Sequence, residues 1–175
     1  MHKRFFKLYY FIEEFKKSII DKQSKNTAII YRNYKKNYKI SEIIYIRDYC
    51  RKKNIKFFLS NNIKLSINLN LDGAYLPSFN QSYSHLSYNF KKNFMLIGSA
   101  HNLREIGIKE RQNVKEIFLS SLFKDNVNYL GLNKFNLLSH YSKKDVIALG
   151  GISMENIKLI NLTKSIGFAG ISYFE

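Results

Sequence analysis

A short apolar run that ends in two glycines is the stretch whose residue types most directly suggest chemistry. Residues 146–149 form the run after Asp145, Gly150 and Gly151 follow it, and Ser153 and Glu155 come next. The run is too short for a helix and predicts a buried strand, while the serine after the glycines predicts a helix cap. Two glycines let the backbone approach a ligand closely, and the N–H groups of a helix start favour an anion. The stretch predicts a phosphate cradle, with an ordinary strand-to-helix turn as the alternative.

Length and composition indicate one domain that spans residues 1–175. With 45% hydrophobic residues, the chain can bury one sizeable core. Cys50 is the only cysteine, so neither a disulfide nor a cysteine-rich metal site can form within the chain, and a reducing compartment fits best. The basic and then apolar residues 1–12 are interrupted by Lys7, and no signal-type cleavage site follows. We expect a cytoplasmic protein without a membrane span, because no apolar run approaches roughly 18 residues.

The formal net charge of +16 raises the question of nucleic-acid binding. Clustered Lys and Arg residues bind nucleic acid by displacing counterions from its phosphates. Here the lysines are spread along most of the chain, with local pairs at positions 16–17, 35–36, 52–53, 91–92 and 143–144. We therefore expect no nucleic-acid partner, and we interpret the charge as a positive field around a site for phosphorylated small molecules.

Short apolar runs and amphipathic stretches alternate along the sequence. Helix caps are expected at Ser41 and Asn102. Strands are expected at residues 7–12, 27–31, 55–59, 73–76, 94–98, 116–120, 145–149 and 168–174. Helices are expected at residues 13–25, 41–53, 62–70, 102–112, 134–141 and 156–165, with a loop or an irregular helix at 78–93.

The alternation of strand and helix, repeated to eight strands, predicts parallel βαβ units. Eight such units can close into a (β/α)₈ TIM barrel, and a doubly wound open sheet is the alternative. The barrel usually needs roughly 200 residues or more, so we expect a compact form of it. The last helix is expected to be missing, because the sequence stops directly after the eighth strand. The third helix is expected to be short, and the fourth is doubtful.

Several short motifs together resemble one protein family. The motifs are residues 72–77 (DGAYLP), 97–102 (IGSAHN), 118–120 (FLS), 146–152 (VIALGGI) and 167–172 (GFAGIS). Their order and spacing are similar to those of the strand-end motifs of the thiamine-phosphate synthase and TenI family. The resemblance implies a phosphate-binding barrel whose site lies at the C-terminal ends of the strands. It also implies a role in thiamine biosynthesis.

The synthase branch of this family couples a pyrimidine methyl diphosphate to a thiazole phosphate, with Mg²⁺ holding the departing pyrophosphate. The resemblance implies that Arg32 contacts the diphosphate and that Asn61 contacts the substrate. Asn62 and Asn80 stand where the family has metal-binding aspartates, and Tyr34 replaces a family lysine. Amide oxygens can ligate Mg²⁺, but without the charge that anchors a hard cation. Mg²⁺ is therefore an implied cofactor whose ligands depart from the family pattern.

The TenI branch aromatises a thiazole carboxylate phosphate by proton transfer and needs no metal. His101 matches the family histidine, and Ser99 matches a serine that touches the substrate. A histidine titrates near neutrality, which suits proton transfer, and a polar loop histidine is the alternative. The resemblance implies that Gly170 binds the phosphate together with Gly150 and Gly151.

Three functions remain open at this stage. The first is an enzyme that couples or tautomerises a thiazole phosphate, the second a barrel that binds thiazole or thiamine phosphate without catalysis, and the third a basic RNA-binding protein. A missing last helix would leave apolar surface on strands one, seven and eight, so a homodimer is expected. The remaining histidines, His2, His85 and His140, are expected at the surface.

Overall fold

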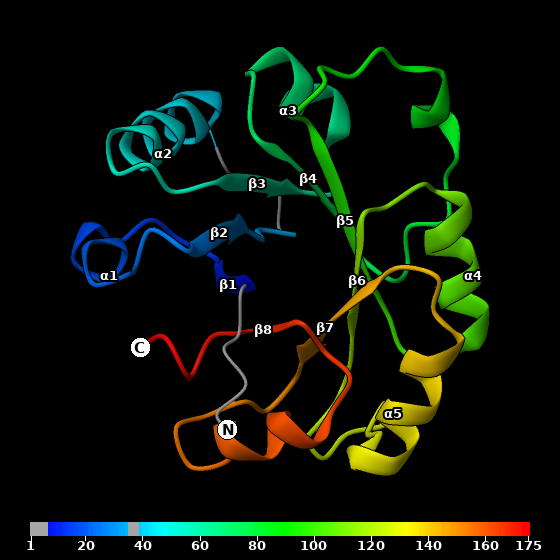
Figure 1. The fold of residues 1–175 in the computed structure, drawn as a ribbon. Coiled ribbons are helices and arrows are strands. Elements are labelled where there is room, and N and C mark those ends of the chain that lie inside the picture. The colour runs from blue at the N-terminus through cyan, green and yellow to red at the C-terminus, as the bar shows by residue number, and fades with distance from the viewer. Residues whose placement is uncertain (1–6, 35–38) are drawn as a thin grey trace.

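Eight parallel strands close into a barrel in the computed structural model, which describes residues 7–34 and 39–175 (Figure 1). Each strand pairs with its neighbour in chain order, and β8 pairs back with β1. The expected (β/α)₈ barrel is therefore confirmed, and the open sheet is wrong. The strands are β1 Lys7–Ile12, β2 Thr27–Tyr31, β3 Phe57–Ser60, β4 Gly73–Leu76, β5 Met95–Ala100, β6 Glu116–Leu119, β7 Asp145–Leu149 and β8 Gly167–Gly170.

A thin layer of short helices surrounds the barrel (Figure 1). The third helix is short and a single 3₁₀ turn replaces the fourth, as the small chain length predicts. In the described residues no helix follows β8, and none of the described helices is long and apolar enough to cross a membrane. The helices are α1 Lys17–Asp21, α2 Ile40–Lys52, α3 Ile63–Asn68, α4 Leu103–Arg111 and α5 Gly131–Tyr141, with 3₁₀ helices η1 Ser84–Ser87 and η2 Ile157–Leu162.

Aromatic side chains fill the axis of the barrel. Tyr9, Phe11, Phe58, Tyr75 and Phe118 belong to one buried cluster, to which β1, β3, β4 and β6 contribute. The Phe118 ring lies 4.8 Å from the Tyr9 ring and 5.6 Å from the Tyr75 ring, in the edge-to-face arrangement that aromatic pairs prefer. Because these rings pack the interior, a ligand is confined to the two ends of the barrel.

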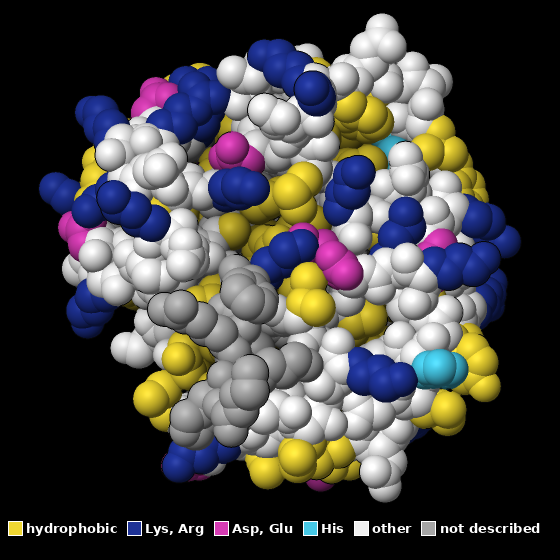
Figure 2. Space-filling model, in the orientation of Figure 1, with side chains coloured by type: hydrophobic (Ala, Val, Ile, Leu, Met, Phe, Trp, Pro, Cys, Tyr) yellow, Lys and Arg dark blue, Asp and Glu magenta, His cyan; other side chains and the backbone are white. Residues whose placement is uncertain are grey.

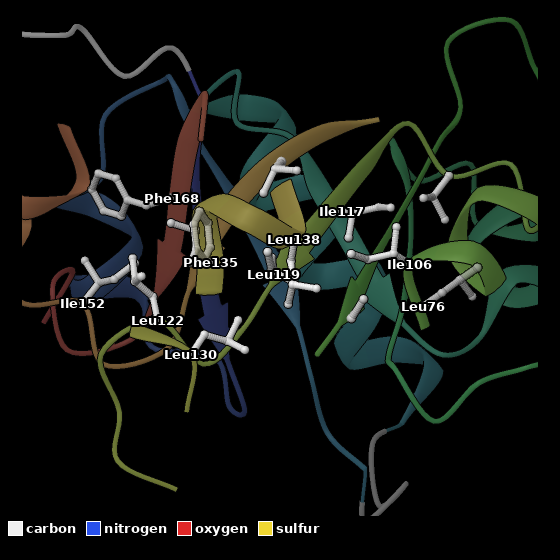
Figure 3. Close-up of a cluster of buried hydrophobic side chains, with 14 of the residues drawn as sticks. Leu76, Ile106, Ile117, Leu119, Leu122, Leu130, Phe135, Leu138, Ile152 and Phe168 are labelled. Carbon is white, nitrogen blue, oxygen red and sulfur yellow. The ribbon is translucent and has the colours of Figure 1, made fainter. Parts of the chain in front are cut away.

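A second hydrophobic core lies between the strands and the outer helices (Figure 3). Phe135 and Leu138 of α5 belong to the same buried cluster as Ile117 and Leu119 of β6, and Ile106 brings α4 into it. Full burial of a large apolar side chain stabilises a fold by about 1.5–3 kcal/mol. This cluster therefore holds in place the helices whose preceding loops form one end of the barrel.

The outer face of β8 is covered by the aromatic residues that follow it. Phe168 is 1% exposed, and its ring lies 4.7 Å from Tyr173 and 5.8 Å from Phe174. The Phe174 ring also reaches Tyr10 of β1 at 5.3 Å. Val146 and Ala148 of β7 are buried as well, so the expected apolar surface on strands one, seven and eight is wrong. Residues 171–174, which we expected to continue the last strand, form a turn that folds back over it.

The helix caps expected at Asn102 and Ser41 have different outcomes. Asn102 caps α4, since its side-chain oxygen accepts a hydrogen bond of 3.0 Å from the N–H of Glu105. The Ser41 cap is wrong, because α2 already begins at Ile40 with Lys39 at the N-cap position, and no side chain of the described residues caps it.

Tertiary contacts move other boundaries. The N–H of Ile55 donates to the carbonyl of Cys50, so Ile55 belongs to the end of α2. Strand β3 therefore begins only at Phe57. Helix α5 begins earlier than expected because the N–H of Gly131 donates to the carbonyl of Leu122 in the loop after β6. The expected helices at 13–25 and 156–165 shorten to Lys17–Asp21 and Ile157–Leu162.

Two glycines provide a matched test of the packing between strands. A Cβ at Gly73 would lie 2.0 Å from the carbonyl oxygen of Met95 and 2.6 Å from the Phe58 ring, whereas a Cβ at Gly107 of α4 would meet nothing within 4 Å. We expect Gly73→Ala to lower the free energy of unfolding by at least about 2 kcal/mol, because β4 and β5 must separate. Gly107→Ala should raise it by about 0.5–1 kcal/mol through helix propensity. Urea denaturation measures both values, and equal stability of the two variants would contradict this packing.

Candidate functional site

A cavity of about 370 Å³ opens at the C-terminal ends of β1, β2, β6, β7 and β8. Arg32, Gly150, Gly151 and Gly170, which the sequence assigned to phosphate or diphosphate binding, all line it. In parallel barrels this end of the strands carries the chemistry. The further lining residues are Phe11, Ser120, Ser121, Lys124, Asn126, Leu149, Ile152, Ile171 and Ser172.

The loop after β6 fixes the orientation of the glycine turn. The N–H of Leu122 donates to the carbonyl of Leu149 at 2.9 Å, and the N–H of Phe123 donates to the carbonyl of Gly150 at 2.8 Å. In a trans peptide the N–H points opposite to the carbonyl. The N–H groups of Gly150 and Gly151 must therefore point away from the loop after β6. Neither has an acceptor among the described residues, so both are available to an anion.

Only glycine fits this turn. Gly150 and Gly151 have φ values of +100° and +73°, in the region that favours glycine. A Cβ at Gly150 would lie 2.5 Å from Ser121 Oγ, and a Cβ at Gly151 would lie 2.4 Å from the backbone nitrogen of Lys124. The two loops therefore approach each other more closely than any side chain at these positions would allow.

The helix expected to follow the glycines does not start at Ser153. The N–H of Ser153 donates to Asn156 Oδ1 at 3.0 Å, and Asn156 Nδ2 donates to the carbonyl of Gly151 at 2.7 Å. The helix itself is the short 3₁₀ segment that begins at Ile157. The predicted serine cap is wrong, because the Asn156 side chain closes a turn in its place. Attraction for an anion thus rests on the free N–H groups of the turn.

Among the residues that the structure describes, two cationic side chains and no carboxylate line the cavity. The guanidinium of Arg32 lies 5.0 Å from the centre of the Phe11 ring, and one of its nitrogens lies 3.3 Å from Glu13 at the surface. Lys124 is the second cation. Glu175 lies instead in a neighbouring cavity of about 300 Å³ with Glu13. The cavity at the glycine turn is therefore suited to an anionic group.

The three asparagines assigned to substrate or metal lie together beside a separate cavity of about 170 Å³. Asn80 Nδ2 donates to Asn61 Oδ1 at 2.7 Å, and Asn80 Oδ1 accepts from the N–H of Ser82 at 3.0 Å. Asn62 Oδ1 caps α3 by accepting from the N–H of Leu65. All three amide oxygens are neutral and already accept hydrogen bonds, so they do not fit a hard divalent cation. The described residues contain no cluster of three or more His, Cys, Asp or Glu side chains that could hold a metal.

His101 is oriented by a carboxylate. Glu105 Oε2 accepts hydrogen bonds from the backbone N–H of His101 and from its Nδ1, both at 2.8 Å. Asn102 Nδ2 holds the other carboxylate oxygen at 3.1 Å. In the neutral ring Nδ1 therefore carries the proton, and Nε2 is the free acceptor. His101 does not line the cavity at the glycine turn.

Ser99 lies on the inner face of β5 and is 5% exposed. Its hydroxyl lies close to the Tyr75 hydroxyl. Burial raises the pKa of Tyr75 above its usual range, so the Tyr75 hydroxyl stays protonated at neutral pH. The structure thus places Ser99 beside a neutral hydroxyl within the mouth of the barrel.

Sequence reasoning missed a buried polar network around α4. Lys109 and Gln112 are fully buried, and His85, expected at the surface, is 2% exposed with Nε2 at 2.9 Å from the carbonyl of Gln112. The surface assignment of His85 is wrong because η1 packs onto α4. A signal was present for Lys109, which lies three residues after the buried Ile106 on the same helix face. His140 is exposed as expected, and His2 lies outside the described residues.

A larger cavity of about 660 Å³ opens at the opposite, N-terminal end of the barrel. Glu116 in its lining is 1% exposed and accepts hydrogen bonds from Lys7 Nζ and from the Tyr9 hydroxyl, each at 2.6 Å. These contacts satisfy the buried carboxylate at the N-terminal end of the barrel. Because parallel barrels carry their chemistry at the C-terminal ends of the strands, we assign the functional site to the smaller cavity.

Basic side chains are scattered over the face that Figure 2 shows, with acidic ones among them. They do not merge into one continuous positive patch on this face. Clustering of that kind is what nucleic-acid binding requires.

Sequence comparison relates the chain to thiamine-phosphate synthases. The family described as thiamine monophosphate synthase matches residues 14–174. The thiamine-phosphate synthase of Methanococcus vannielii is 28% identical over 120 residues, which are 66% of this chain and 58% of that protein. The thiamine-phosphate synthase of Latilactobacillus sakei is 27% identical over 130 residues, 70% of this chain and 58% of that protein. The match thus spans less than two thirds of the length of these relatives.

Solved structures show the same fold. The thiamine phosphate pyrophosphorylase of Pyrococcus furiosus has a TM-score of 0.75 at 22% identity, over 95% of this chain and 85% of that one. FabK of Thermotoga maritima has a TM-score of 0.73 at 12% identity, over 97% of this chain and 59% of that one. Identities this low bear on the fold alone.

The fold and its mouth define a compact (β/α)₈ barrel with a glycine-turn cavity at the C-terminal ends of the strands. The family match covers nearly the whole chain, so the chain belongs to the thiamine monophosphate synthase family.

The contact between His101 and Glu105 predicts the ring tautomer. We expect the neutral His101 ring to carry its proton on Nδ1, and we expect Glu105→Ala to remove this preference because the carboxylate acceptor is lost. Long-range ¹H–¹⁵N NMR of the two ring nitrogens measures the tautomer. Glu110→Ala, the same exchange on the same helix, is the control and should leave the spectrum of His101 unchanged. A proton on Nε2 in the unmodified protein would contradict this geometry.

Lys109 gives a pH-dependent contribution to stability. Burial lowers the pKa of Lys109 to about 8, from 10.5 for a free lysine. Between these values the unfolded chain binds more protons at this residue than the folded chain, so the contribution of Lys109 to stability rises with pH from about 8 to 10.5. We expect the free energy of unfolding of the unmodified protein to increase over this window relative to Lys109→Met.

Chemical denaturation at several pH values checks this difference. Lys134→Met, at an exposed position, is the control for the loss of one positive charge. A constant difference between the unmodified protein and Lys109→Met across the window would show that the ammonium is not desolvated.

Proposed function

We propose that this chain is an enzyme of thiamine biosynthesis that acts on a thiazole phosphate at the C-terminal mouth of the barrel. Membership of the thiamine monophosphate synthase family supports the pathway. The single observation that carries the site is the pair of N–H groups at Gly150 and Gly151, which have no acceptor within residues 7–34 and 39–175 and face away from the loop after β6. In this proposal the phosphate of the substrate accepts hydrogen bonds from both groups.

The proposed reaction is the coupling of the thiazole phosphate to a pyrimidine methyl diphosphate. Such a reaction requires positive charge where the leaving pyrophosphate develops negative charge. Arg32 and Lys124 are the cationic side chains at the cavity. The contact of Arg32 with Glu13 involves an exposed carboxylate and is worth at most about 1 kcal/mol, so a diphosphate can displace it.

Tautomerisation of a thiazole carboxylate phosphate is the second candidate. The observation that favours it is the contact between His101 and Glu105, which leaves Nε2 as a base of defined orientation. Binding of a thiazole or thiamine phosphate without turnover is the third. The neutral amides at Asn62 and Asn80, where the family has metal carboxylates, favour that outcome.

Three further expectations belong to this proposal. The enzyme would work in the cytoplasm on phosphorylated small molecules. A homodimer remains part of the proposal, although aromatic residues after β8 cover the strands that suggested it. Mg²⁺ would have to be held by residues other than the asparagine set, because that set does not fit a divalent cation.

A turnover assay with one variant tests the proposal. The unmodified protein is mixed with the pyrimidine methyl diphosphate and the thiazole phosphate, with and without Mg²⁺, and thiamine phosphate is followed by chromatography. We expect product from the unmodified protein. Gly150→Ala should lose activity by at least about 100-fold, because a Cβ there displaces the loop and the N–H pair no longer holds the thiazole phosphate in the position for reaction.

Gly107→Ala is the matched control for this assay, because its Cβ would meet no atom within 4 Å and the residue lies on an outer helix. Product without any effect of Gly150→Ala would place the phosphate elsewhere. Absence of both thiamine phosphate formation and thiazole tautomerisation would contradict an enzymatic function.

A further inference from the structure

A lysine ammonium is enclosed beneath the loop that follows β4. Lys109 is 0% exposed, although it belongs to the outer helix α4. Its Nζ lies 2.8 Å from each of three oxygens: the carbonyls of Pro77 and Asn80, and Gln112 Oε1. The three donors of the ammonium thus meet three acceptors, and none of these acceptors is a carboxylate.

The barrel wall is shaped to admit this side chain. A Cβ at Gly98 of β5 would lie 2.9 Å from Lys109 Cδ, so the lysine stem passes where that residue has no side chain. Burial of an ammonium without a carboxylate partner is costly and rare in folded proteins. The hydrogen bonds that Lys109 makes to the loop offset this desolvation cost.

Those hydrogen bonds hold one wall of the cavity that the asparagines line. Gln112 Nε2 donates to the carbonyl of Ser82 at 2.8 Å and to that of Asn80 at 3.1 Å. Asn80 in turn donates to Asn61 at 2.7 Å. A continuous chain of hydrogen bonds therefore runs from Lys109, through the loop after β4, to the end of β3.

This arrangement disfavours the binding of a divalent cation near Asn80. Three oxygens around one positive charge resemble the coordination of a bound metal ion, but here the charge is covalently attached. A second cation near Asn80 would be repelled by the ammonium, and neutral amides supply no compensating charge.

We propose that Lys109 is a tethered cation that fixes the loop after β4 and its amide pair, and that this edge of the mouth works without a resident divalent cation. Lys109 is then a positioning residue, since it touches the loop and not the substrate. The inference rests on the proposed function only in assigning the loop to the substrate site. The following tests do not depend on turnover.

The first test is metal binding to the full chain. Mn²⁺ is titrated into the protein, and paramagnetic broadening of the side-chain amide signals of Asn61 and Asn80 is followed by NMR. We expect no selective broadening of these signals below about 1 mM Mn²⁺, a range in which carboxylate sites bind divalent cations. The double variant Asn80→Asp/Lys109→Met is the matched comparison and should show broadening of the Asn61 side-chain amide, which it retains. Selective broadening in the unmodified protein would overturn the proposal.

The second test is hydrogen exchange of the backbone N–H groups in residues 78–82. Lys109→Met should accelerate exchange there by at least about tenfold, because the loop loses its anchor while the core of the barrel is retained. Lys134→Met is the control and should leave the loop protected. Unchanged protection in Lys109→Met would overturn the positioning role. If Lys109→Met does not fold, Gln112→Ala provides the same readout, since it removes the neighbouring contacts with Asn80 and Ser82.

Discussion

The hydrogen bonds from the loop after β6 to the carbonyls of Leu149 and Gly150 decide what the mouth of the barrel can bind. Each peptide unit is planar and trans, so a carbonyl held on the side of the loop leaves the N–H of the same peptide pointing to the other side. The turn must then consist of glycines, because the two loops touch through backbone and no Cβ fits between them. Arg32 and Lys124 add positive charge around the N–H groups. The anion-binding character of the cavity thus follows from a contact between two loops.

The small size of the chain is accommodated on the outside of the barrel. The interior is packed with aromatic rings such as Phe118, so the strands remain a closed and rigid support. On the outside, short helices and 3₁₀ turns replace full helices, and Tyr173 and Phe174 cover β8 in the described residues. The cavity at the glycine turn therefore lies on a complete barrel, in spite of the reduced outer layer.

The sequence predicts the barrel because short apolar runs alternate with amphipathic stretches until eight strands are reached. It predicts the glycine turn because positive φ and close approach of the backbone demand glycine. It does not predict the side-chain partners that replace expected local contacts. Asn156 closes the turn where Ser153 was expected to cap a helix. His85 is buried because η1 packs against the end of α4, and Lys109 is buried because the loop after β4 folds over it. Both contacts join segments far apart in the chain. Polar residues that a local pattern assigns to the surface are recovered only when such tertiary contacts are known.

The most direct measurement of the central claim is an NMR titration of the uniformly ¹⁵N-labelled protein with the thiazole phosphate. If the phosphate binds at the glycine turn, the N–H signals of Gly150 and Gly151 shift strongly downfield as they donate to it, while Lys25 and Lys56 at the N-terminal cavity do not respond. Shifts confined to the N-terminal cavity, with unchanged signals from the two glycines, would contradict the account.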